Sequence, residues 1–189
     1  MSPALQITEL EQARCYFDRV RQLVTRATAS LTESQWKFKP APDRWSIAEI
    51  LEHMAVAQER VLGRLQTQLQ AAPAPPAGRD HKRIDAAIFE KIPDRSVKAQ
   101  APEMIRPTGT WTLPFAVDRL FEGHSQLLEF LETTPGLRDH VLESPPLKVV
   151  TKGEYDAADG YQWVLTAAAH DERHLRQIEE VKSDPGFPK

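Results

Sequence analysis

The chain of 189 residues has little cysteine, no excess of basic residues and no long apolar run. Its one cysteine, Cys15, excludes an internal disulfide, and a cytoplasmic setting is expected. The net charge of −3 argues against a nucleic acid or an anionic membrane as partner. No apolar stretch approaches the roughly 20 residues of a membrane span. The start, Met1–Ala4, lacks the charged region of a signal peptide.

Apolar residues make up 41% of the chain and recur in steps of three and four, which is the spacing of helices with one buried face. We therefore expect an all-α protein, a single four-helix bundle with long crossover loops, built as one domain over 1–189. The four patterns cover 10–31, 45–72, 113–131 and 163–181. Ser46 and Glu49 have the spacing of a capping box, so the second helix should begin beside them.

Two long connections separate these patterns. The segment 72–110 is rich in proline, which removes amide donors, so only His81–Lys91 is expected to form a short helix there. The segment 137–159 is expected to be irregular. Its run Lys148–Thr151 has an extended composition but does not predict a sheet. Connections of this length are often functional.

Histidines carry most of the functional information. His170 and His174 are four residues apart and lie within the apolar stripe of the fourth helix, so both side chains should point inward from one face. Such histidines are hydrogen-bonded core residues or metal ligands, and the spacing alone leaves both readings open. His53 lies on the flank of the second stripe. His124 lies within the third stripe and competes with His53 as a further ligand.

Several segments together resemble the DinB-like superfamily, which includes the YfiT-type candidate metalloenzymes. The segment 45–54, WSIAEILEHM, is similar to its second-helix signature, and 170–178, HDERHLRQI, is similar to its fourth-helix signature. Trp36, Pro40 and Pro42 fit the usual lead-in, and 93–96 with 101–103 resemble the middle loop. The resemblance implies a four-helix bundle with one divalent transition metal, zinc or nickel, on His53, His170 and His174.

The function implied by this resemblance is that of a metal-dependent enzyme. The favoured activities are low-molecular-weight-thiol S-transfer, with the thiol as a second cofactor, and hydrolysis of a small-molecule substrate. Catalytic residues are not assigned. The alternatives are a non-catalytic metal-binding module of the stress response and a protein-association module. Relatives are thought to dimerise, so a homodimer is also an expectation of the resemblance.

Other polar residues are candidates to support such a site. Glu49, Asp171 and Gln177 lie near the histidines in sequence and are candidates to orient them, although Glu49 has its capping role and Asp171 is expected to face solvent. Arg44, Arg95 and Arg106 are candidates to bind the carboxylates of a thiol cofactor.

Overall fold

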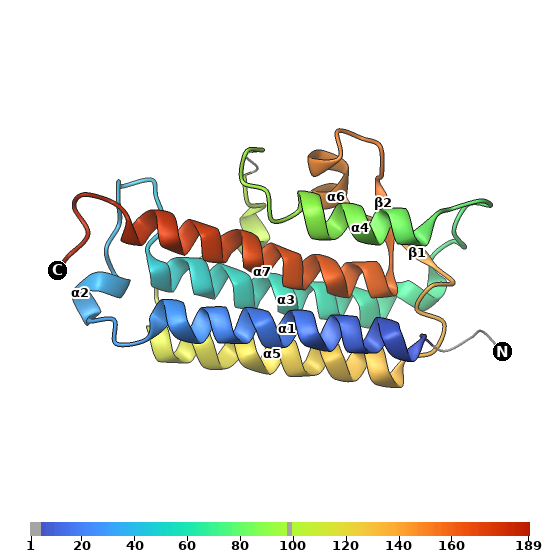
Figure 1. Cartoon of the computed structure of the whole chain (residues 1–189), viewed down its shortest axis with the longest axis horizontal. Helices are drawn as coiled ribbons and strands as arrows, with labels where there is room; N and C mark the ends of the chain where they lie inside the picture. The colour runs from blue at the N-terminus through green and yellow to red at the C-terminus, as the bar shows by residue number, and fades with distance from the viewer. Residues whose placement is uncertain (1–4, 98–99) are drawn as a thin grey trace.

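Long helices dominate the computed structural model, which describes residues 5–97 and 100–189 (Figure 1). Four of them run side by side along the long axis of the molecule. They are α1 (Ile7–Thr28), α3 (Ile47–Gln68), α5 (Leu113–Thr133) and α7 (Gly160–Lys182). Each corresponds to one apolar pattern, so the prediction of a mostly helical protein is confirmed. The expectation for Met1–Ala4 falls outside the described residues.

Short elements occupy the connections between the long helices. The helix expected at His81–Lys91 is α4, with the predicted bounds. The remaining elements are α2 (Glu33–Trp36), η1 (Leu69–Ala71), η2 (Glu103–Ile105), β1 (Val141–Glu143), α6 (Pro145–Val150) and β2 (Ala157–Asp159). In Figure 1, α4 and α6 lie on the outer side of α7.

The expectation that 137–159 is irregular was wrong in part. Strands β1 and β2 form a small antiparallel pair in which Val141 lies opposite Asp159. The run 148–151, considered as extended, instead lies at the end of α6. Pro145 and Pro146 occupy the first turn of this helix, where a missing amide donor costs nothing.

Side-chain caps explain where the helices that carry the histidines begin. The Ser46 hydroxyl accepts from the Glu49 amide at 3.2 Å, and the Glu49 carboxylate accepts from the Ser46 amide at 2.7 Å. This capping box confirms the predicted start of α3. Asp159 and Gln162 form the equivalent pair at α7, at 2.8 and 3.1 Å. Both helices therefore begin at fixed residues.

The core lies between the four long helices. Phe17, Leu51, Leu120 and Val164, one from each, are all fully buried. Helix α3 packs against both α5 and α7, so one of its faces meets the helix that carries His170. Among the described residues, no helix is both long and apolar enough to cross a membrane.

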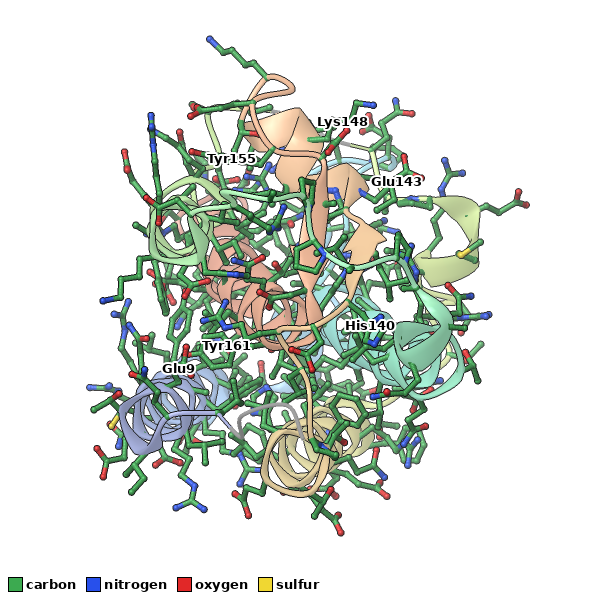
Figure 2. The ribbon with its side chains drawn as sticks, turned by 90° about the vertical axis from the view of Figure 1, so that its right-hand side faces the viewer. Glu9, His140, Glu143, Lys148, Tyr155 and Tyr161 are labelled. Carbon is green, nitrogen blue, oxygen red and sulfur yellow. The ribbon has the colours of Figure 1, made fainter. Side chains whose placement is uncertain are left out.

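One end of the helices is closed by a polar cluster around Arg138. Its guanidinium donates to Glu9 at 2.8 Å, to Asp85 at 2.7 Å and to the buried Asp159 at 2.9 Å. The Tyr161 hydroxyl donates to the backbone oxygen of Glu9 at 2.9 Å. Figure 2 looks onto this end, with Glu9 and Tyr161 beside the helices and the α6 segment above them. The cluster ties α1, α4 and the start of α7 together at this end of the long helices.

Candidate metal centre

Helices α3 and α7 bring three histidines to one point. His170 and His174 are one turn apart on α7, and His53 reaches them from α3. The three Nε2 atoms are 3.1, 3.1 and 3.2 Å from one another. His53 and His174 are buried, whereas the side chain of His170 is 24% exposed. The burial of His53 was not foreseen from its place on the flank of the apolar stripe.

Hydrogen bonds fix the orientation of two of these rings. The Nδ1 of His53 lies 2.7 Å from the carbonyl oxygen of Ile105, which can only accept. The Nδ1 of His174 lies 2.8 Å from Gln177 Oε1. This amide oxygen also accepts from Arg95 at 3.3 Å, so the group that faces His174 is an acceptor. Both rings therefore carry their proton on Nδ1 and turn the Nε2 lone pair toward the centre.

The environment keeps the rings of His53 and His174 neutral. Burial, together with the neighbouring His170, lowers the pKa of His53 to about 4, although the bond to the Ile105 carbonyl partly opposes this. Burial lowers the pKa of His174 well below its usual value, and His170 and His53 add to the effect. At neutral pH His53 and His174 thus present unprotonated Nε2 atoms, the form of histidine that binds metals.

The cluster has the spacing of ligands around a single ion. Nitrogens about 2.1 Å from one ion would be about 3.0 Å apart at right angles and about 3.4 Å apart at the tetrahedral angle. The observed separations of 3.1–3.2 Å lie between these values. Lone pairs that face one another repel unless a cation lies between them. The three histidines are therefore compatible with a divalent metal site.

A loop between α4 and α5 covers His53 and is held by Glu52, a residue that sequence reasoning missed. The Glu52 side chain is 1% exposed and accepts from the amide and hydroxyl of Thr108, both at 2.7 Å, and from the Gly109 amide at 3.1 Å. This loop carries the Ile105 carbonyl that orients His53. The position of Glu52 at helical spacing between the buried Ala48 and Ala55 was a signal that it faces inward.

A second polar cluster lies behind the histidines and corrects the expectation for Asp171. This residue was expected to face solvent, but it is fully buried. Its Oδ2 accepts from His124 Nε2 at 2.9 Å and from the Gln58 amide. The expectation failed because Asp171 lies on the side of α7 that packs against α3 and α5, the helices that carry Gln58 and His124. His124 is thus a hydrogen-bonded core residue, and it does not join the cluster of three.

Of the other polar residues that were candidates to support the site, one contacts a histidine and the rest have partners elsewhere in the chain. Gln177 contacts His174 as expected, whereas Glu49 serves as the capping acid and pairs with Lys39 at 2.8 Å. Arg95 donates to Glu180 at 2.7 and 2.9 Å, and Arg44 lies 3.7 Å from the same carboxylate. Arg106 donates to the backbone oxygen of Ala101. These arginines already have partners within the chain.

A surface cleft lies apart from the histidines. It has a volume of about 710 Å³, includes Trp36 and Trp111 in its wall, and is bordered by none of the three histidines. Its lysines, Lys37 and Lys39, pair with glutamates at 2.5 and 2.8 Å. The chemistry of the donor atoms, not the size of a hollow, therefore identifies the histidine cluster as the candidate site.

Comparisons with known proteins point to one family. The family model described as the DinB superfamily matches residues 16–178. An uncharacterized protein of Bacillus subtilis (strain 168), YuaE, is 22% identical over 166 residues, which cover 88% of this chain and 94% of YuaE. No solved structure matches.

Proposed function

Because the chain belongs to the DinB superfamily, we propose that it is a metal-dependent enzyme with one divalent ion on His53, His170 and His174. The observation that carries the proposal is the convergence of three Nε2 atoms while two Nδ1 atoms donate elsewhere. The proposal keeps the four-helix bundle as its architecture, because four long helices run side by side and two of them carry the three ligands.

The residues around the cluster have separate tasks in this proposal. The Ile105 carbonyl and Gln177 hold His53 and His174 in the tautomer that binds. The ring centroid of Trp45 lies 4.8 Å from that of His53 and 6.4 Å from that of His174. The indole therefore shields one side of the cluster from water. The partly exposed His170 marks the side from which a small molecule approaches.

Two reactions suit this arrangement, low-molecular-weight-thiol S-transfer and hydrolysis. An ion held by three neutral imidazoles would supply a Lewis acid that makes a thiol or a water a stronger acid and hence a nucleophile at neutral pH. Three protein ligands leave room for such a molecule, as in catalytic rather than structural sites. We favour zinc or nickel, since imidazole suits both.

The first test is elemental analysis of protein purified without a polyhistidine tag. We expect one metal per chain in the parent and none in a folded His170→Ala/His174→Ala double variant. His140→Ala is a matched control, because the Nδ1 of this histidine donates to the carbonyl oxygen of Ala72, away from the cluster. It should retain the metal. A parent that takes up neither zinc nor nickel after incubation and dialysis would rule out the site.

A second test separates an enzyme from a binder. The metal-loaded parent is assayed for loss of a small thiol in the presence of an electrophile, and for hydrolysis of activated esters. Turnover that disappears in the double variant supports the enzyme. Stoichiometric metal binding without turnover in either the thiol assay or the ester assay supports the non-catalytic metal-binding module instead.

A further inference from the structure

His170 is the one member of the cluster whose Nδ1 lacks a hydrogen-bond partner among the residues that the structure describes. The Nδ1 atoms of His53 and His174 both have acceptors within 2.8 Å. The Oδ1 of Asp171 lies 3.9 Å from the Nδ1 of His170, too far for a hydrogen bond. A ligand histidine almost always donates its second ring nitrogen to an acceptor. The Nδ1 of the third ring therefore has no acceptor among the described residues.

Asp171 has the matching acceptor, an oxygen without a donor. Its side chain is fully buried, and its Oδ1 has no hydrogen-bond partner among the described residues. An unpartnered oxygen of a buried carboxylate is costly, because it has lost its bonds to water and gained none in return. The acceptor without a donor and the donor without an acceptor thus lie next to each other.

The other oxygen of Asp171 is held firmly by the remaining long helices. His124 on α5 and Gln58 on α3 both donate to Oδ2. Arg21 on α1 donates to the Nδ1 of His124 at 3.3 Å. Because arginine only donates, His124 must carry its proton on Nε2, and its ring donates to Asp171. This leaves Oδ2 fully used and only Oδ1 available toward His170.

We propose that Asp171 is a positioning residue of the metal centre, with Oδ1 accepting the Nδ1 proton of His170 when an ion occupies the cluster. A movement of about 1 Å brings the two atoms to hydrogen-bond distance, and His170 is the most exposed and hence least confined of the three rings. The bond fixes the tautomer of His170 and places a negative charge behind the cation. The inference rests on the proposed metal site.

The test is the zinc affinity of the full chain, measured by competition with a chromophoric chelator. In Asp171→Asn, the amide oxygen turns to the two donors, so the NH₂ group faces the Nδ1 proton of His170. We expect zinc binding to weaken by about 10–100-fold. Glu172→Gln is the matched control, because this neighbouring carboxylate bonds to Tyr16 and Arg19, not to the cluster. It should stay within about threefold of the parent.

The cobalt(II) absorption spectrum gives a readout that a merely structural role would not move. The d–d bands should shift in Asp171→Asn and remain in place in Glu172→Gln. Unchanged bands and a zinc affinity within threefold of the parent would overturn the inference. A parent that binds no zinc overturns the proposed function as well, whereas equal binding by parent and Asp171→Asn overturns the inference alone.

If Asp171→Asn fails to fold, the zinc-loaded parent is examined by ¹H–¹⁵N NMR of its imidazoles. Three slowly exchanging Nδ1 protons, one from each ligand, are expected. Slow exchange at His53 and His174 but not at His170 would overturn the inference.

Discussion

The buried carboxylate of Glu52 offers a sharp test of how the loop over His53 is held. In Glu52→Gln, the amide oxygen still accepts from Thr108, but its nitrogen faces the Gly109 amide, so one of three bonds is lost. A hydrogen bond to a charged group contributes about 1.5–3 kcal/mol, and the two remaining bonds also lose their charge. We expect the free energy of unfolding to fall by about 2–3 kcal/mol, and the melting temperature by about 4–12 °C.

The same substitution should loosen the histidine cluster, because the loop carries the Ile105 carbonyl that accepts from His53. Zinc affinity should fall by at least about tenfold, which chelator competition measures. Glu59→Gln is the control on the same helix. Its carboxylate forms an exposed ion pair with Arg119, so a loss below about 1 kcal/mol is expected. A Glu52→Gln variant that melts at the parent temperature and binds zinc equally well would refute the reasoning.

Two further predictions concern packing and pH. Gly123→Ala should destabilise the protein by about 1–3 kcal/mol, because its Cβ would lie 2.5 Å from Gln58 Oε1 and displace a donor to Asp171. In Gly63→Ala the added Cβ meets nothing within 4 Å, so this variant should be more stable than the parent by about 0.5–1 kcal/mol. Urea unfolding measures both variants, and a change of the same sign in the two free energies of unfolding would contradict the structure. In metal-free protein, acid should destabilise the fold between pH 6.5 and 4, because His53 takes up its proton at about pH 4 when folded and at about 6.5 when unfolded. The loss attributable to His53 is about 2 kcal/mol at pH 5, and unfolding of His53→Leu should depend less on pH over this range.

The sequence by itself determined the four long helices and the inward direction of His170 and His174. The apolar spacing located all four long helices, and the Ser46–Glu49 pair fixed the start of α3, because these signals are local. The four-residue step likewise put His170 and His174 on one inward face. That His53 belongs with them followed only from the family resemblance, since its place in the helical pattern suggested partial exposure.

Tertiary structure alone decided what surrounds the three histidines. Glu52 and Asp171 are acids, a residue type that is usually exposed, yet both are buried. A loop from 56 residues away covers Glu52, and three other long helices surround Asp171. The short strands were also beyond the sequence, since three residues cannot show a period. Burial and hydrogen bonding between distant segments depend on how the helices pack. This packing is set by residues from the whole chain together, so no single segment of the sequence predicts it.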